Sequence, residues 1–275
     1  MFTLNCKGRL LLADKPLVMG IINVTPDSFY EASRFVTEDS ILKQAEKMIR
    51  EGADILDIGG QSTRPGAGRL GEDEELKRVM GAVKSIADNF PGTVISIDSF
   101  YSKVAKEAIQ GGASMINDIS AGDFDKAMLS VVGELGVPFV CMHMKGEPYT
   151  MQQNPVYENV TKEVLDFFIR KKEECRMAGI NDIIIDPGFG FGKNAIHNFE
   201  LLKNLPVFKM LDCPLLLGIS RKATIYKTLG ITPNESLNGT TVLHTIGLLN
   251  GADILRVHDV KEAREAISLF WHYIK

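Results

Sequence analysis

The sequence predicts a single (β/α)8 barrel, or TIM barrel, of the α/β class, and three observations carry this prediction. Short apolar segments and amphipathic segments alternate along all 275 residues. The apolar segments number eight, which gives about 34 residues per strand–helix unit, the size of a βα repeat. A polar or charged residue stands at or just after the end of each apolar segment.

The apolar segments are rich in Ile, Val and Leu and do not alternate with polar residues. This composition is typical of parallel strands that are covered on both faces. The expected strands are residues 17–22, 53–58, 93–98, 113–117, 138–143, 182–186, 214–219 and 252–257.

Helices are expected between these strands, for example at 40–52, 72–90 and 159–179. In the third, Val160, Val164, Phe167 and Phe168 follow the spacing of a one-sided helix. A doubly wound sheet is the competing architecture, but the glycine-rich phosphate turn that usually follows its first strand is missing. No linker or change in composition divides the chain, so residues 1–275 are expected to form one domain.

Composition excludes several classes of protein. With 45% apolar and 24% charged residues the chain is neither disordered nor fibrous. A net charge of −4 argues against nucleic acid or an acidic membrane as partner. No apolar run approaches the ~18 residues of a membrane span, and the first twenty residues carry charges rather than a signal-peptide core. The four scattered cysteines favour reduced thiols, and we expect a cytoplasmic protein.

Polar residues at the strand ends indicate an active site. They are Asn23, Asp57, Asp98, Asn117, His143, Asp186, Ser220 to Lys222, Arg256 and His258. In a parallel barrel these ends meet at one mouth, where active sites are built. Lys, Arg and His are not preferred helix caps, so capping alone does not explain the set. The mixture of carboxylates and cations suggests a ligand with both N–H donors and an anionic group.

Two glycine-rich loops and the histidines refine this interpretation. Residues 59–66, GGQSTRPG, favour an anion site, and Arg64 offers a planar fork for phosphate oxygens. Residues 186–193, DPGFGFGK, place two phenylalanines among glycines, and one of them is expected to face a planar ligand. The histidine spacing favours no zinc or iron cage. A Mg²⁺ ion held mainly by a phosphorylated substrate, with Asn23 as a protein ligand, is compatible.

Several segments together carry a resemblance to a known family. They are MGIINVTPDSF (19–29), DIGGQSTRPGA (57–67), SID (96–98), IND (116–118), MHMKGEPYTMQ (142–152), DPGFGFGK (186–193), SRK (220–222) and RVHDV (256–260). In this order the chain resembles dihydropteroate synthase from residue 17 to about 265. The resemblance implies a (β/α)8 barrel, a cytoplasmic homodimer and Mg²⁺. It also implies that 6-hydroxymethyl-7,8-dihydropterin pyrophosphate and p-aminobenzoate condense to 7,8-dihydropteroate and pyrophosphate in folate biosynthesis.

The resemblance also implies a role for individual residues. The pterin would contact Asp98, Asn117, Asp186, Lys222 and Arg256. The pyrophosphate would contact Asn23 (through Mg²⁺), Thr63, Arg64 and the Arg256–Val257–His258 segment. Phe29, Pro65, Phe191 and Lys222 would enclose the aminobenzoate, where sulfonamides would compete. Catalysis would fall to Arg64, Asp98, Lys222, Arg256 and His258, through a dissociative loss of pyrophosphate that leaves a cation on the pterin methylene.

The chain departs from the commoner family pattern at three places. Tyr30 to Ser33 replace a frequent glycine pair, and Gln61 stands where glutamate is frequent. Ala223 stands where a serine often meets the aminobenzoate carboxylate. Thr224, or the amides of a helix starting near residue 221, could take over this contact.

Alternatives remain for single residues and for the function. Asp57 is as readily a structural partner of loop backbone as a ligand contact, and His143 and Met144 are expected to pack beneath the mouth. Ile267, Phe270, Trp271 and Ile274 fit a core or dimer face. A methyltetrahydrofolate-binding corrinoid methyltransferase would share the barrel but needs no pyrophosphate site. An inactive pterin-binding module would be expected to have lost part of the anion site.

Overall fold

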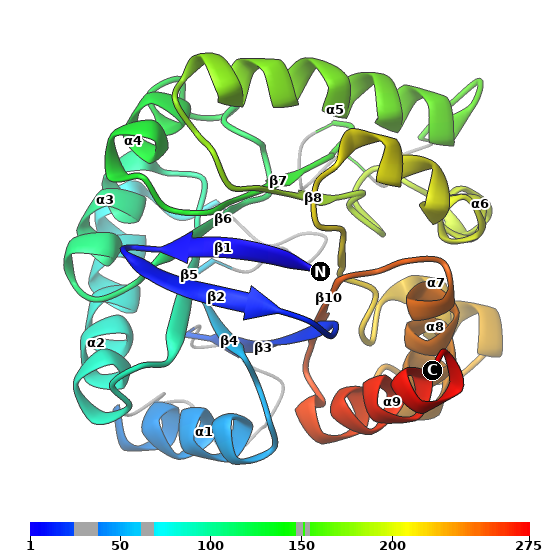
Figure 1. Cartoon of the computed structure of the whole chain (residues 1–275), viewed down its shortest axis with the longest axis horizontal. Coiled ribbons are helices and arrows are strands. Elements are labelled where there is room, and N and C mark those ends of the chain that lie inside the picture. The colour runs from blue at the N-terminus through cyan, green and yellow to red at the C-terminus, as the bar shows by residue number, and fades with distance from the viewer. Residues whose placement is uncertain (25–37, 62–68, 147–150, 152–154) are drawn as a thin grey trace.

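Eight parallel strands form one sheet that curls into a barrel (Figure 1). The computed structural model describes residues 1–24, 38–61, 69–146, 151 and 155–275. The strands are β3 (Leu17–Asn23), β4 (Ile55–Gly59), β5 (Val94–Asp98), β6 (Met115–Asp118), β7 (Phe139–Met142), β8 (Ile183–Asp186), β9 (Leu216–Leu217) and β10 (Ile254–Val257). All eight predicted strands are confirmed.

The order of the strands excludes a doubly wound sheet. It runs β8-β7-β6-β5-β4-β3-β10-β9, so the chain order never reverses around the sheet. A parallel bridge between Ile185 and Leu215 joins β8 to the segment that leads into β9. The Ile185 amide donates to the Pro214 carbonyl at 3.0 Å, which brings the two ends of the sheet together as the barrel prediction requires.

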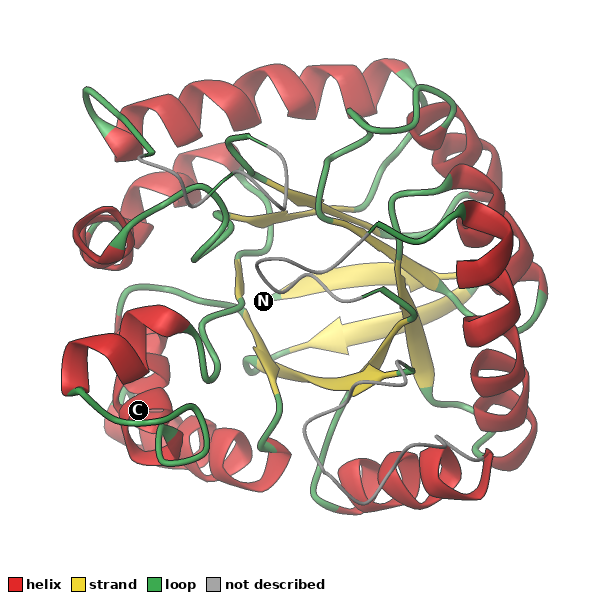
Figure 2. Cartoon of the chain, turned by 180° about the vertical axis from the view of Figure 1, so that it is seen from behind, coloured by secondary structure: helices red, strands yellow, loops and turns green. Residues whose placement is uncertain are grey.

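Helices surround the sheet (Figure 2). They are α1 (Glu38–Arg50), α2 (Glu72–Asn89), α3 (Ser102–Gln110), α4 (Met128–Leu135), α5 (Val160–Met177), α6 (Ala195–Lys203), the 3₁₀ helix η1 (Leu205–Leu211), α7 (Ala223–Leu229), α8 (Leu237–Leu249) and α9 (Val260–Tyr273). The three predicted helices begin and end within two residues of α1, α2 and α5. None of the helices described is long and apolar enough to cross a membrane.

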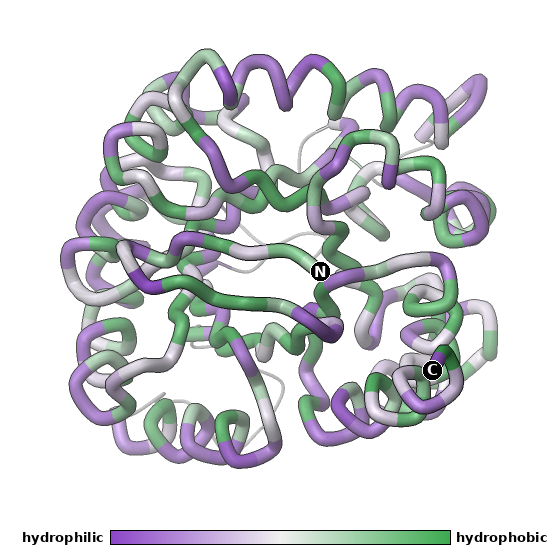
Figure 3. Tube along the Cα trace, viewed as in Figure 1, coloured by the Kyte–Doolittle hydropathy of each residue, from purple (hydrophilic) through white to green (hydrophobic). Residues whose placement is uncertain are grey.

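The main core lies between the strands and the helices. In α5 the spacing read from the sequence holds, since Val160, Val164 and Phe168 are buried and Phe167 packs beside them. In Figure 3 hydrophobic colour accordingly follows the strands, whereas the outer turns of the helices are mostly hydrophilic. Burial of such one-sided apolar faces is the main favourable term in forming the barrel.

An antiparallel hairpin that the sequence analysis did not predict covers one end of the barrel (Figure 1). It consists of β1 (Phe2–Cys6) and β2 (Arg9–Ala13). Lys7 and Gly8 between them have φ of 57° and 86°, the two positive values that a type I′ hairpin turn needs. Leu4, Cys6 and Ala13 pack against side chains from the interior of the barrel. The hairpin does not cover the opposite end, at which the strands have their carboxyl ends.

Side chains inside the barrel change from apolar to polar toward the carboxyl ends of the strands. The apolar layer consists of Met19, Ile55, Val94, Met115, Val140, Ile184, Leu216 and Ile254. Two residues further along each strand, on the same face, stand Ile21, Asp57, Ser96, Asn117, Met142, Asp186, Gly218 and Arg256. The polar residues at the strand ends are therefore brought to one mouth, as predicted.

Candidate functional site

Arg256 lies between two carboxylates at the barrel mouth. Its Nε is 2.7 Å from Asp57 Oδ2, and its Nη2 is 2.6 Å from Asp98 Oδ2. The three residues come from β10, β4 and β5. Burial opposes the guanidinium charge, but Asp57 and Asp98 outweigh burial and raise the pKa of Arg256. Burial raises the pKa of Asp98 to about 7, although the charge of Arg256 acts to lower it. The charged form of this carboxylate is therefore only weakly favoured near neutral pH.

Asn117 and Asp57 extend this group toward β6. Asn117 Nδ2 donates to Asp57 Oδ2 at 3.0 Å. Among the described residues Asp57 is a partner of two side chains, Asn117 and Arg256, and no contact with loop backbone is seen there. Asp57 Oδ1 is buried and has no hydrogen-bond partner among the described residues. The strand ends thus hold Arg256 and Asn117 in fixed orientations without any ligand.

Asp186 and Lys222 form a second pair across the mouth. Asp186 Oδ1 accepts a hydrogen bond from the Gly188 amide at 2.8 Å, and burial raises the pKa of this carboxyl. Burial lowers the pKa of Lys222 to about 8, although Asp186 favours its charged form. Lys222 Nζ donates to the Phe189 carbonyl at 2.5 Å and lies 4.6 Å from the centre of the Phe191 ring.

Gly218 leaves space beside this second pair. A Cβ at Gly218 would lie 3.4 Å from Asp186 Oδ2 and 3.8 Å from Lys222 Nζ. Any larger side chain at this inward position would occupy the volume between the buried acceptor Asp186 and the half-buried donor Lys222. A flat ligand with an N–H edge and an acceptor edge suits that volume, because a carboxylate can accept two parallel hydrogen bonds.

His258 is held from behind by Ser220. The His258 amide donates to Ser220 Oγ at 3.2 Å, and Ser220 Oγ lies 3.1 Å from His258 Nδ1. Because Ser220 Oγ already accepts from that amide, its own proton is available to Nδ1, which leaves the imidazole proton on Nε2. His258 is exposed among the described residues, but partial desolvation at the mouth and then Arg256 lower the pKa of its ring, which favours a neutral ring that can donate.

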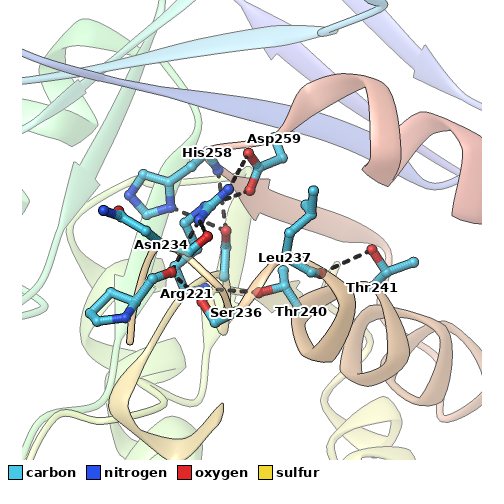
Figure 4. Close-up of polar contacts among 10 residues, drawn as sticks. Arg221, Asn234, Ser236, Leu237, Thr240, Thr241, His258 and Asp259 are labelled. Atoms are coloured by element: carbon cyan, nitrogen blue, oxygen red, sulfur yellow. Dashed lines mark hydrogen bonds and ion pairs between the residues drawn. The ribbon is translucent and has the colours of Figure 1, made fainter. Parts of the chain in front are cut away.

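Arg221 fastens the loop that carries Ser220 and Lys222 (Figure 4). Its Nε and Nη2 donate to the two oxygens of Asp259 at 2.7 and 2.8 Å, and its Nη1 donates to the carbonyls of Pro233 and Asn234 at 3.0 Å each. Its φ of 54° is left-handed, a conformation that costs a non-glycine residue free energy and needs such support. The sequence analysis placed Arg221 at the mouth but missed this supporting role and its partner Asp259.

The two phenylalanines of the 186–193 loop pack in different groups of side chains. Phe189 is fully buried in the main core, whereas Phe191 belongs to a small apolar group at the mouth with Phe100, Ile119, Met142 and Met151. His143 is buried and packs edge-on against Phe167 at 4.9 Å between ring centres, so the packing interpretation holds for His143.

Two expectations near the mouth need correction. The Val257 side chain is fully buried in the main core, so only its backbone could meet a substrate. Thr224 is buried and its Oγ1 accepts from Asn198 Nδ2 at 2.8 Å, which leaves it poorly placed to replace the missing serine. The helix beside it begins at Ala223, with Lys222 as its N-cap residue, rather than at residue 221.

Four predicted site residues lie outside the described residues: Phe29, Thr63, Arg64 and Pro65. Beside the 62–68 segment, Gln61 Oε1 accepts from the Leu70 amide at 2.9 Å, and Gln61 Nε2 donates to Glu75 Oε2 at 2.9 Å. Gln61, one of the departures from the family pattern, therefore links the two sides of the 62–68 segment and ties them to α2.

Asn23, the predicted metal ligand, is exposed at the end of β3. No cluster of three or more His, Cys, Asp or Glu suited to a metal occurs in the part of the chain that the structure describes. A single amide oxygen fits Mg²⁺ only if substrate oxygens and water supply most of its ligands.

Comparisons with known proteins agree with this geometry. Residues 19–258 match the family of pterin binding enzymes. Dihydropteroate synthase from Escherichia coli K12 is 43% identical over 95% of this chain and 93% of its own length. The enzyme from Haemophilus influenzae is 43% identical over 97% of both chains.

Solved structures lead to the same family. A dihydropteroate synthase from Yersinia pestis, determined with a sulfonamide drug complex, superposes with a TM-score of 0.94 at 38% identity and covers 99% of each chain. One from Xanthomonas albilineans in complex with 7,8-dihydropteroate gives 0.89 at 36% identity, over 99% of this chain and 98% of the other. This chain therefore belongs to the dihydropteroate synthase family of pterin-binding enzymes.

Proposed function

We propose that this protein is a transferase that joins 6-hydroxymethyl-7,8-dihydropterin pyrophosphate to p-aminobenzoate, giving 7,8-dihydropteroate and pyrophosphate for folate biosynthesis. The observation that carries the proposal is the opposite charges of buried Asp186 and half-buried Lys222, beside the space that Gly218 leaves open. A relative from Xanthomonas albilineans binds 7,8-dihydropteroate and 4-aminobenzoic acid, which are the product and one substrate of this reaction.

The pterin ring would lie across the polar layer of the barrel. Asp186 would accept from the 2-amino group and the adjacent ring N–H with its two oxygens, since Oδ1 keeps a second lone pair beside the one that accepts from the Gly188 amide. Lys222 would donate to the ring carbonyl and a neighbouring nitrogen, and Asn117 would meet a mixed donor and acceptor edge. Arg256 would stack its guanidinium plane on the ring.

Departure of pyrophosphate would be assisted by groups that donate to its oxygens. Neutral His258 would donate from Nε2, since Ser220 occupies the Nδ1 side. Arg256 would contribute charge, and Arg64 and Thr63 would complete the anion site. Such donors stabilise the negative charge that builds up on the leaving group in a dissociative transition state. Asp98, next to Arg256, would favour the cation that forms on the pterin methylene.

The aminobenzoate ring would bind against Phe191, near Lys222, with Phe29 and Pro65 completing the enclosure. Its arylamine would attack the methylene, and a weakly basic amine loses its proton without a strong general base. Exclusion of water from the closed site would protect the cation from hydrolysis.

Mg²⁺ would be bound by Asn23 together with oxygens of the pyrophosphate and water. When bound, it would neutralise charge on the leaving pyrophosphate. A homodimer is part of the proposal, and exposed apolar side chains near the C-terminus support it: Leu249 and Ile246 on α8, Leu269 and Tyr273 on α9, and Ile274. We also propose a cytoplasmic location, in keeping with four cysteines that form no disulfide.

The two alternatives predict different behaviour. A corrinoid methyltransferase would use the pterin-binding carboxylates but has no need for His258 as an oriented donor or for Lys222 beside an aromatic ring. An inactive binding module would have no reason to retain the ordered Arg256, Ser220 and His258 group. The described part of the anion site is complete, which favours the synthase.

The test is an assay with purified protein, Mg²⁺, dihydropterin pyrophosphate and p-aminobenzoate, scored for dihydropteroate by chromatography. We expect product that depends on Mg²⁺ and is absent with Arg256→Ala. Failure of the wild-type protein to form product, together with measurable pterin binding, would favour the methyltransferase or the inactive module.

A further inference from the structure

Lys193 is a buried lysine that the proposed reaction does not use, and burial lowers the pKa of its ammonium group well below the ordinary value. It is 1% exposed and, among the described residues, no carboxylate forms an ion pair with it. Its Nζ lies 2.8 Å from His143 Nδ1, 3.0 Å from the carbonyls of Gly188 and Phe191, and 3.2 Å from the His143 carbonyl. Burial of an ammonium group away from water is costly, so these neutral acceptors must compensate for the lost hydration.

His143 is matched to this role. An ammonium group has three donors and no acceptor, so His143 Nδ1 must accept. Burial and the nearby Lys193 lower the pKa of His143 well below its ordinary value, which keeps the ring neutral with its proton on Nε2. Lys193 thus bonds both the side chain and the main chain of a residue in the loop after β7, and two carbonyls in the loop after β8.

The loop after β8 carries the parts that meet the substrates. Its Gly188 and Phe191 carbonyls point to Lys193, while the Phe189 carbonyl between them accepts from Lys222 Nζ. The Phe191 ring lies beside the same Lys222 Nζ. The Lys193 ammonium therefore fixes the backbone on both sides of the carbonyl that holds Lys222, and at the residue whose ring faces it.

The backbones of the loops after β7 and β8 lie so close together that two glycines between them leave no room for a side chain. A Cβ on Gly188 would lie 1.9 Å from the His143 carbonyl oxygen, and one on Gly192 would lie 2.1 Å from the Lys145 carbonyl oxygen. Both glycines have positive φ, 70° and 64°, which L side chains rarely adopt. The backbones meet directly, and an ammonium on a long stem reaches the acceptors left between them.

We propose that Lys193 and His143 are a positioning pair that sets the Phe191 ring and the Lys222 ammonium for the aminobenzoate. Lys193 is not a catalytic residue, because it is enclosed by protein and touches no substrate. The inference rests on the proposed synthase function. It assigns the pair mainly to the aminobenzoate half of the site, since the Phe191 ring would meet only the aminobenzoate, whereas the pterin would also be held by Asp186, Asn117 and Arg256 on the strands.

The test compares Lys193→Met with Lys171→Met in the synthase assay. Lys171 is also a buried lysine, but it is paired with Asp123 at 2.8 Å and Glu174 at 2.7 Å and serves as the matched control. For Lys193→Met we expect a rise in KM for p-aminobenzoate of about tenfold or more, a change of the size expected for the loss of one hydrogen bond to the substrate. The Kd for the pterin substrate, from calorimetry, should rise by a smaller factor, because Lys222 would supply only part of the pterin contacts. Lys171→Met should change neither.

A purely structural role gives a different result. Partial unfolding lowers the concentration of active enzyme, and with it the apparent kcat, but leaves KM unchanged. An unchanged KM in Lys193→Met would therefore overturn the proposal. If that variant does not fold, His143→Leu and His143→Asn replace it. The leucine removes the acceptor and should raise the same KM, whereas asparagine keeps an acceptor near Nδ1 and should restore it. Equal KM values in both would overturn the proposal, and an inactive wild-type protein would overturn both this inference and the proposed function.

Discussion

Replacement of Arg256 by methionine tests the charged centre of the site. The variant keeps the length of the side chain and removes its charge. In the structure Arg256 contacts Asp57, whose side chain is 0% exposed, and Asp98, whose side chain is 17% exposed. Loss of the guanidinium leaves two adjacent carboxylates without a counter-charge, and Asp57 Oδ1 already lacks a partner among the described residues.

The expected loss of unfolding free energy is about 3 kcal/mol at pH 8, the lower end of the range for removing one partner from a buried ion pair. Partial exposure of Asp98 and Arg256 argues for the lower end. The loss should depend on pH. The folded-state pKa of Asp98 is raised from 3.8 to about 7 and should rise further without Arg256. A raised folded pKa means that stability is lost as the pH increases from about 4 through that pKa. The deficit of the variant should therefore shrink toward pH 5.

Urea unfolding of both proteins between pH 5 and 8.5 measures this, with a common m-value as evidence that the folded states are comparable. A control variant, Arg256→Met combined with Asp57→Asn and Asp98→Asn, removes all three charges. It should recover most of the stability but none of the turnover, because the donor to pyrophosphate is still missing. A deficit below about 1 kcal/mol that does not change with pH would refute the assignment of this ion pair as an energetic centre.

Three further predictions concern the ligands. Asp186→Asn should weaken pterin binding by about 10- to 100-fold in calorimetry, because an amide cannot accept two parallel hydrogen bonds; unaltered affinity would count against its role. Burial lowers the pKa of Lys222 to about 8, and loss of its proton removes the positive charge and one of three donors, so kcat/KM should fall as the pH rises through about 8. In an active Lys222→Arg variant this limb should disappear, and an unmoved limb would assign it to another group. Sulfonamides should compete with p-aminobenzoate at the pocket of Phe191, Phe29 and Pro65, and full turnover at saturating drug would rule out that pocket.

Much of the fold could be predicted because each strand is a local signal. The segment 182–186 contains three consecutive isoleucines and ends in Asp186, and this pattern alone gives both a buried strand and the position of a mouth residue. The positions of the site residues on β4, β5, β6, β8 and β10 followed from the same rule, since parallel strands all present their carboxyl ends to one side.

The N-terminal hairpin was missed although its signal was present. Phe2, Leu4 and Cys6 alternate with polar residues, and Lys7–Gly8 is a two-residue turn between two short segments. The charged residues among the first twenty make this alternation less obvious. The contacts of Lys193 and Arg221 were beyond sequence reasoning for another reason. Lys193 depends on carbonyls of its own loop and of His143, and Arg221 on those of residues 233 and 234. No residue pattern identifies a carbonyl acceptor in advance.

Gly218→Ala separates the ligand site from the fold. At this inward position a Cβ would contact Leu216, Asp186 Oδ2 and Lys222 Nζ at 3.4–3.8 Å, which are ordinary van der Waals distances, so the protein alone should accept the methyl group. The free energy of unfolding should stay the same or increase by about 0.5 kcal/mol through the lower entropy of the unfolded chain.

Pterin binding should nevertheless weaken by about tenfold or more, because the methyl group takes the volume in which the ring must approach Asp186 Oδ2. Gly81→Ala on the outside of α2, where a Cβ meets nothing within 4 Å, is the matched control and should alter no binding constant. Calorimetry with the pterin substrate, beside urea unfolding, decides the matter. If Gly218→Ala binds pterin normally, the ring does not lie between Asp186 and Lys222. If Gly218→Ala unfolds at a lower urea concentration than the wild-type protein while Gly81→Ala does not, the folded protein itself requires the space beside Gly218, and that space is no ligand site.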